Sequence, residues 1–157
     1  MGEEKEKPRL LSTLPFSIHG PGRARRHADG NVRGFHVIKR SLPFRVRNVT
    51  RGTFLGDAIE KAESSAQRRT GLLKHKKLVE GEGLWIAPCE AVHTFFMKFA
   101  IDLIYIDRKH RVKSVVRGVR PWRFSACFSA HSILELPTGT IDRTKTEKGD
   151  ELELRPG

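Results

Sequence analysis

The chain has 157 residues, of which 38% are hydrophobic, a length that suits one domain of ordinary size. Its two cysteines are too few for a disulfide framework, and it has no CxxC pair of the kind typical of structural zinc sites. The formal net charge of +12 predicts attraction to polyanions without specifying a site. No apolar run has the length of a signal peptide or a membrane span, so we expect a soluble cytoplasmic protein.

The first part of the chain differs in composition from the rest. Residues 1–40 are rich in Pro, Gly, Arg and His and show neither helical nor strand periodicity. We expect this stretch to be a disordered or loosely docked basic arm. From Phe44 the sequence FRVRNV alternates apolar and polar residues, as a half-buried strand does. The folded domain is therefore predicted to span residues 44–154.

The first half of this domain is predicted to contain strands and one helix. A strand is expected through about Ala62, followed by a helix from about Ser65 to Lys74 with Ser64 as its N-cap. LWIAP follows the turn-like EGEG and predicts a short strand. From Phe95 to Tyr105 every second residue is apolar or aromatic, which is strand periodicity.

The second half of the domain continues this pattern. A polar turn at DRKH joins YID to the alternating strand RVKSVV, SILELP is a strand that ends at Pro137, and ELEL is a last alternating strand. Short strands separated by turns at fairly even intervals indicate a mainly β protein, either a β-sandwich or an open barrel, with one helix.

Five motifs occur in a fixed order: RRTGLL, GEGLWIAPC, HTFFMKFAIDLIYID, SILELPTG and KGDELEL. Together they resemble the DUF192 family, also called UPF0127, over about Phe44 to Leu154. The resemblance implies a β-sandwich of jelly-roll character with a short helix packed on it. It implies no activity, because the family is one of uncharacterised proteins. The family's signature positions correspond to Arg68, Gly71, Leu72, His93, Thr94, Met97, Ile101, Asp102, Glu135, Pro137, Gly139, Gly149 and Asp150.

One departure from the family pattern lies in the predicted hairpin turn. His110 stands where family members often carry glycine. Histidine tolerates left-handed backbone geometry better than most residues, so we expect the turn to form.

Cys89 and His93 raise the question of chemistry. On a straight strand, four steps of about 3.3 Å separate them by roughly 13 Å, which is too far to share a metal ion. A turn would bring them closer, and His131, Glu135 or Cys127 are candidates for a third ligand. The alternatives are a metal- or thiol-dependent enzyme centred on this pair, or a buried cysteine and a structural histidine. We assign no catalytic residue, metal ligand or cofactor.

Polar residues that interrupt core-forming segments are our candidates for ligand binding. Asp102 lies between two apolar runs, so its carboxylate either ties a turn to the sheet or marks a polar pocket. Glu135 in SILELP poses the same alternatives. The candidate ligand-binding residues are His93, Thr94, Lys98, Asp102 and Glu135. Our first hypothesis is therefore a noncatalytic module that binds a small polar ligand or a protein.

Basic residues suggest another kind of partner. A further hypothesis is weak, salt-dependent binding of nucleic acid through the arm and the basic helix. The candidate residues are Arg68, Arg69, Lys74, Lys76 and Lys77.

Aromatic residues add to this hypothesis. Trp122, Phe96 and Phe124 are candidates for a platform that stacks on a sugar or a base, with Arg120 and Arg123 at its rim. Trp85 is also aromatic, but its place within LWI favours the core. No Walker loop, GxGxxG, HExxH or GxSxG motif occurs, so the commonest nucleotide-binding, zinc-protease and serine-hydrolase classes lack their motifs.

Overall fold

The computed structural model describes residues 42–73 and 75–157, so the predicted arm at residues 1–40 lies outside the described residues. The strands are β1 (Phe44–Asn48), β2 (Thr53–Ala62), β3 (Gly81–Ile86), β4 (Ala91–His93), β5 (Ile101–Ile106), β6 (Val112–Val119), β7 (Phe124–Ala126), β8 (Ser132–Pro137) and β9 (Leu152–Pro156). The helices are α1 (Ser65–Thr70) and α2 (Thr140–Thr144). No helix in this described part is long and apolar enough to cross a membrane.

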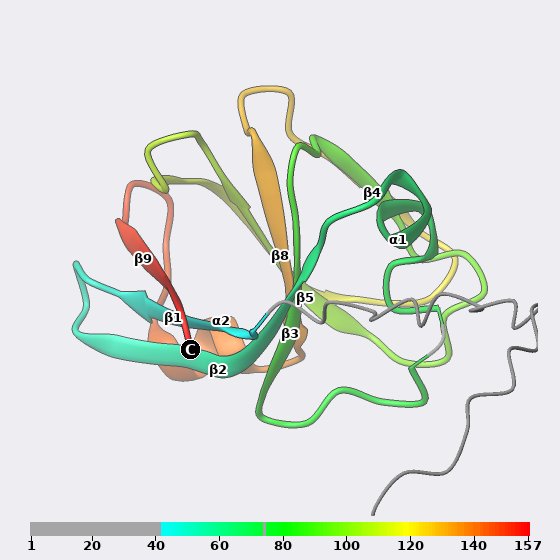
Figure 1. Cartoon of the computed structure of the whole chain (residues 1–157), viewed down its shortest axis with the longest axis horizontal. Helices are drawn as coiled ribbons and strands as arrows, with labels where there is room; N and C mark the ends of the chain where they lie inside the picture. Colours follow the sequence, from blue (N-terminus) through cyan, green and yellow to red (C-terminus); the bar gives the residue numbers. More distant parts are fainter. Residues whose placement is uncertain (1–41, 74) are drawn as a thin grey trace, which may run out of the picture. The chain divides into compact units, whose positions relative to one another are not determined.

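The strands form two sheets. Seven strands make a curled sheet in the order β6-β5-β8-β3-β2-β1-β9, and β4 pairs with β7 in a separate two-stranded sheet (Figure 1). The pair β2–β3 is parallel and the other strand pairs are antiparallel. The prediction of a mainly β, sandwich or open-barrel fold is confirmed, with the difference that the structure has two short helices where one was expected.

Apolar side chains cover both faces of the large sheet. All six residues of β5 are buried, and alternate ones point to opposite faces. Leu103 and Tyr105 belong to one cluster, together with Leu72 and Met97, which we call the α1-side core. Ile104 and Ile106 belong to a second cluster with Ile141 of α2, the α2-side core. The central strands β5 and β8 are therefore buried on both faces.

The strand predicted from Phe95 begins later than expected. β5 starts at Ile101, and the preceding residues form turns and bends. Phe96 has a φ of 65°, which no strand residue adopts, and the carbonyl of Thr94 accepts a hydrogen bond from Met97 N at 3.3 Å. The apolar alternation over this stretch thus reflects a turn in which Met97 is buried while Phe96 is exposed.

Helix α1 begins where the sequence predicts. Ser64 and Gln67 form a capping box, in which Ser64 Oγ accepts from Gln67 N at 3.1 Å and Gln67 Oε1 accepts from Ser64 N at 2.8 Å. The predicted end at Lys74 is too late, because Gly71 takes a positive φ of 46° and the helix stops at Thr70.

The turn at His110 also agrees with its prediction. His110 has a φ of 60°, and its amide donates to Asp107 O at 3.0 Å. The expected hairpin between β5 and β6 therefore forms without glycine at this position.

Candidate functional site

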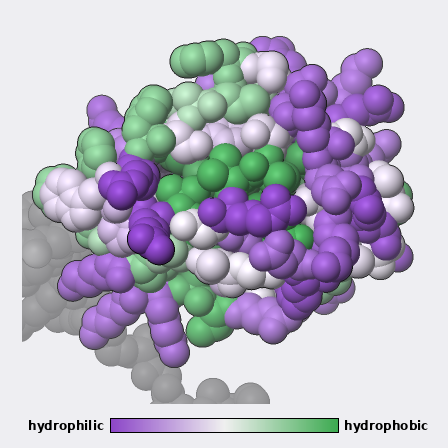
Figure 2. All heavy atoms as spheres, turned by 180° about the vertical axis from the view of Figure 1, so that it is seen from behind, coloured by the Kyte–Doolittle hydropathy of each residue, from purple (hydrophilic) through white to green (hydrophobic). Residues whose placement is uncertain are grey.

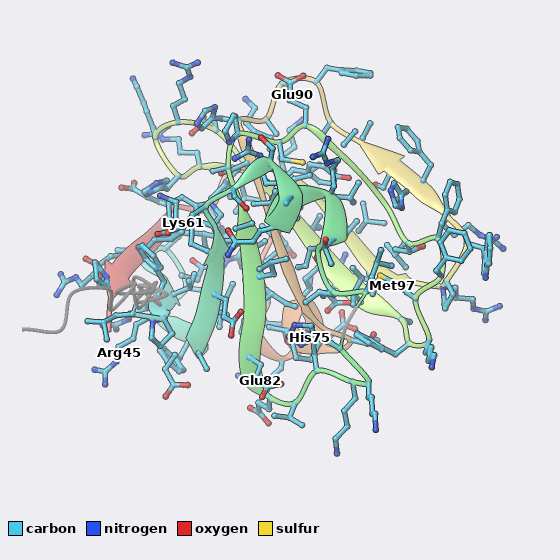
Figure 3. The ribbon with its side chains drawn as sticks, turned by 45° about the vertical axis from the view of Figure 1, so that its right-hand side comes forward. Arg45, Lys61, His75, Glu82, Glu90 and Met97 are labelled. Carbon is cyan, nitrogen blue, oxygen red and sulfur yellow. The ribbon has the colours of Figure 1, made fainter. Side chains whose placement is uncertain are left out.

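A cavity of about 210 Å³ lies between α1 with the residues that follow it, strand β4 and the α1-side face of the sheet. Figure 1 shows α1 and β4 on the same side of the large sheet. In Figure 3 Met97 lies between the ribbon of α1 and the aromatic side chains at the right-hand edge. The lining residues that matter below are Arg68, Gly71, Cys89, His93, Met97 and Glu135. We call this cavity the Glu135 pocket.

Glu135 is the buried polar group of this pocket. It lies in β8, opposite Leu84 of β3 and Leu103 of β5. The residue is only 5% exposed, and within the described residues its Oε2 atom has no hydrogen-bond partner. Burial raises the pKa of the Glu135 carboxyl to about 7, because the charged form loses its hydration. Near neutral pH the side chain can therefore either donate or accept a hydrogen bond.

The turn after α1 approaches this carboxyl closely. A Cβ atom placed on Gly71 would lie 3.8 Å from Glu135 Oε2. Glycine at this position allows the left-handed turn that ends α1 and leaves the space over the carboxyl open. Arg68 in the last turn of α1 also lines the pocket, where its guanidinium donates to Ser65 Oγ at 3.0 Å.

Cys89 also lines the pocket, but the hydrogen of its thiol is already used in a hydrogen bond. Its Sγ donates to Ala91 O at 3.1 Å, and burial raises the pKa of the thiol above its usual value. A nucleophilic cysteine needs a lowered pKa or an adjacent base. The environment of Cys89 does the opposite and favours a structural side chain.

His93 lies on the rim of the same pocket. It is exposed in β4, and its ring stacks on Phe95 with centroids 5.0 Å apart and an interplanar angle of 18°. Among the described residues no hydrogen bond joins His93 to Cys89. Nor do any three His, Cys, Asp or Glu side chains of that part of the chain group as metal ligands.

Asp102 lies on the other face of the sheet, away from the Glu135 pocket. It is 1% exposed, and its carboxylate accepts hydrogen bonds from the backbone amides of Gly118 at 2.9 Å, Gly139 at 3.0 Å and Ile141 at 2.9 Å. These bonds tie β6 and the start of α2 to β5. The arrangement favours the first alternative for Asp102, a carboxylate that ties turns to the sheet.

The other ligand candidates also lie outside the pocket. Thr94 is buried, and its Oγ1 donates to Arg120 O at 2.8 Å and accepts from Arg123 N at 2.9 Å. Lys98 is exposed in the turn before β5. Of the five predicted residues, the structure thus brings His93 and Glu135 together at the pocket.

The basic candidates do not form one cluster with the pocket. Arg68 and Arg69 line it, whereas Lys76 and Lys77 are exposed in the segment between α1 and β3. Lys74 lies outside the described residues.

Sequence reasoning did not place Gly71, Met97 and Arg68 around Glu135. Two local signals pointed to this pocket: a glutamate flanked by apolar residues in SILELP, and the Cys89/His93 pair, beside which Glu135 was one of the candidates for a third ligand.

The model of the DUF192 family, described as "Uncharacterized ACR", matches residues 46–154. A UPF0127 protein of Thermococcus sibiricus is 33% identical over 112 residues, covering 68% of this chain and 71% of that protein. A UPF0127 protein of Pyrococcus furiosus is 31% identical over 112 residues, covering 68% of this chain and 94% of the relative.

Two crystal structures share the fold. One is a candidate transcription regulator of Sinorhizobium meliloti, with a TM-score of 0.64 and 22% identity over 73% of this chain and 95% of that one. The other is a protein of unknown function from Novosphingobium aromaticivorans, with a TM-score of 0.62 and 23% identity over 71% of this chain and 83% of that one.

Proposed function

The chain belongs to the DUF192 (UPF0127) family, and within this uncharacterised family we propose that it is a noncatalytic binding module whose Glu135 pocket takes a small ligand. The observation that carries the proposal is the buried Oε2 atom of Glu135, which lacks a hydrogen-bond partner in the described part of the chain. A buried polar atom left unpaired costs about 1–3 kcal/mol. A ligand that donates a hydrogen bond to this atom would remove that cost.

The dimensions of the pocket limit the ligand. Sites for drug-sized molecules measure roughly 300–1,000 Å³. The Glu135 pocket, at about 210 Å³, is smaller. It therefore suits a small molecule, or one group at the end of a longer molecule.

The walls of the pocket define the chemistry of the ligand. Ile86, Leu72 and Met97 supply apolar surface, and Glu135 supplies the buried polar contact. Arg68 and Arg69 add positive charge from the last turn of α1. We therefore expect a ligand with a compact apolar part, an N–H or O–H group that bonds Glu135, and an acceptor that points towards the arginines.

The alternative of a thiol enzyme has less support. Because burial raises the pKa of Cys89 and its hydrogen is donated to Ala91 O, the residue is a poor nucleophile at neutral pH. The cytoplasmic location and the nucleic-acid role of the arm and the basic helix stay predictions.

A fragment screen by protein-observed NMR tests the proposal. Small amines, amides and alcohols should shift the backbone amide signals of Gly71, Leu72 and Val92. The variant Glu135→Leu should lose these shifts, because it removes the polar contact while keeping a side chain that fills the space. Glu151→Gln is the matched control, since Glu151 is exposed and neither it nor its chain neighbours line the Glu135 pocket. Fragments that bind Glu135→Leu as well as the parent protein, or a screen with no hits, would contradict the proposal.

A further inference from the structure

Several aromatic side chains are exposed on the segments around β4 and β7. Phe96 is 68% exposed, Trp122 56% and Phe124 68%. The ring centroids of Phe96 and Trp122 are 4.8 Å apart, and those of Phe95 and Trp122 are 5.8 Å apart. His93 stacks on Phe95, and it lies opposite Phe124 in the pairing of β4 with β7. These five residues, His93, Phe95, Phe96, Trp122 and Phe124, form a contiguous surface that we call the aromatic platform.

The backbone holds two of these rings in an unusual conformation. Phe96 has a φ of 65° and Trp122 a φ of 63°, and bulky residues rarely adopt this left-handed region. Such conformations cost free energy and persist only where surrounding contacts impose them. Exposed apolar rings also gain little from burial in the folded chain. The exposure of these rings is therefore a feature that packing in the folded chain does not explain.

Thr94 imposes this geometry. Its Oγ1 bonds Arg120 O and Arg123 N, its backbone amide donates to Arg123 O at 2.9 Å, and its carbonyl accepts from Trp122 N at 3.0 Å. The side chain and backbone of one buried residue thereby join the turn that carries Phe96 to the segment that carries Trp122. Both rings stand on this hydrogen-bonded support.

A groove with arginines borders the platform. It has a volume of about 340 Å³, and its lining includes Arg117, Arg120, Arg123 and Phe124. Arg117 pairs with the exposed Asp142 at 2.8 Å, while the guanidinium of Arg120 has no hydrogen bond or ion pair within the described residues. In Figure 2, which is turned by 180° from Figure 1, hydrophobic and pale side chains on the left alternate with strongly hydrophilic ones.

We propose that the aromatic platform and this arginine-lined groove bind single-stranded nucleic acid. Unpaired bases stack on Trp122 and Phe96, and the adjoining phosphates follow the groove past Arg120 and Arg123. Every base has a π-face that stacks on an aromatic ring, and arginine pairs with phosphate, so binding needs no particular base sequence.

The charge and shape of the surface favour this partner over others. The chain carries a net charge of +12, which attracts polyanions. A duplex hides its base faces and offers nothing to stack on Trp122. An anionic membrane would contact the exposed rings but would leave the groove beside Phe124 unfilled. A single strand uses both the platform and the groove.

Fluorescence anisotropy with the full chain and labelled DNA strands of about ten nucleotides tests the proposal. The probes are oligo(dT), and an abasic strand of equal length that keeps the phosphates but has no bases. We expect oligo(dT) to bind at least about fivefold more tightly, because stacking on each aromatic ring contributes that much or more. Binding through general positive charge alone would not distinguish the two strands.

Variants of the platform are chosen to keep the fold. Glycine adopts a φ of 63° without strain, so Trp122→Gly removes the ring and preserves the turn. Trp122→Asn is a second variant that tolerates the same backbone, and the thermal unfolding midpoint shows that each variant is folded. Both should bind oligo(dT) at least about fivefold more weakly and the abasic strand unchanged.

Arginine variants test the groove. Arg120→Gln and Arg123→Gln should each make the negative slope of log K against log salt shallower by up to about 0.7, the value for one phosphate contact in a single strand. Arg45→Gln is the matched control, because Arg45 is exposed on β1 and lies far from Met97 in Figure 3. It should leave the affinity for oligo(dT) within about twofold of that of the parent protein, since one remote charge adds little.

Two results would overturn the proposal. One is equal affinity of the folded Trp122→Gly and parent proteins for oligo(dT). The other is Trp122-dependent binding to phosphatidylserine vesicles without binding to oligo(dT), which would assign the surface to membranes. Because Trp122 and Arg120 lie outside the Glu135 pocket, either result leaves the proposed small-ligand site unaffected.

Discussion

Asp102 and Glu135 lie on the neighbouring strands β5 and β8, yet they face opposite sides of the sheet and have opposite environments. The carboxylate of Asp102 accepts three backbone hydrogen bonds, whereas Oε2 of Glu135 accepts none within the described residues. Two buried acidic residues on adjacent strands thus differ in role. Asp102 supports the fold, whereas Glu135 leaves a polar atom free for a ligand.

The raised pKa of Glu135 predicts a loss of stability at neutral pH. In the unfolded chain the carboxyl titrates near 4.5 and in the folded protein at about 7, so between these values the folded state binds more protons. Stability is therefore fully present below pH 4.5 and falls as the pH rises to about 7, by up to about 3 kcal/mol. Urea unfolding across this range, compared with Glu135→Gln, measures the effect. A free energy of unfolding with the same pH dependence in both proteins would contradict it.

Replacement of Asp102 is predicted to destabilise the fold without altering the pocket. Asp102→Ala leaves the amides of Gly118, Gly139 and Ile141 without their acceptor, and we expect a loss of about 3–5 kcal/mol in the free energy of unfolding. The control Asp142→Asn breaks only an exposed ion pair and should cost less than about 1 kcal/mol. Equal urea midpoints for Asp102→Ala and the control would rule out this role of Asp102.

Thr94 is predicted to hold the two aromatic segments through its hydroxyl. Thr94→Val removes the bonds to Arg120 O and Arg123 N and should cost about 1–3 kcal/mol, whereas Thr94→Ser keeps the hydroxyl and should cost less. Hydrogen exchange at the amide of Trp122, which donates to Thr94 O, is the local readout. It should accelerate in Thr94→Val alone. Acceleration in both variants would show that the hydroxyl is not what fixes the turn.

Cys89 is predicted to react slowly with alkylating reagents at neutral pH. Burial raises the pKa of its thiol, and the thiol hydrogen is donated to Ala91 O, so little thiolate forms. Mass spectrometry after treatment with iodoacetamide, on the variant Cys127→Ser, follows Cys89 alone. The folded protein should react more slowly than the same variant in urea. Modification of the folded protein at the faster rate would restore the thiol-enzyme hypothesis.

Local features of the fold were predictable from the sequence because neighbouring residues determine them. The capping box at Ser64 and the turn at His110 depend on side chains a few positions apart. The turn before β5 was not predictable, because the bonds that shape it come from Arg120 and Arg123, which are distant in sequence. Helix α2 was missed for the same reason, since its start is fixed by Asp102.

The candidate site was harder to predict from the sequence than these parts of the fold. Asp102 and Glu135 each interrupt an apolar run, and no pattern in the sequence indicates which one meets backbone donors. That outcome depends on which face each side chain takes and on what packs there. Glu135 faces Gly71 and the end of α1, so its pocket appears only when these distant segments meet.

A direct titration of the Glu135 side-chain carboxyl by carbon-13 NMR, with and without a fragment bound, tests the central claim. We predict that the carboxyl of the free protein titrates near pH 7. A bound fragment should shift the pKa of this carboxyl, because it donates a hydrogen bond to Oε2. A carboxyl that titrates near 4.5, with a pKa that no fragment changes, would contradict the claim that Glu135 is buried, unpaired and able to bind a ligand.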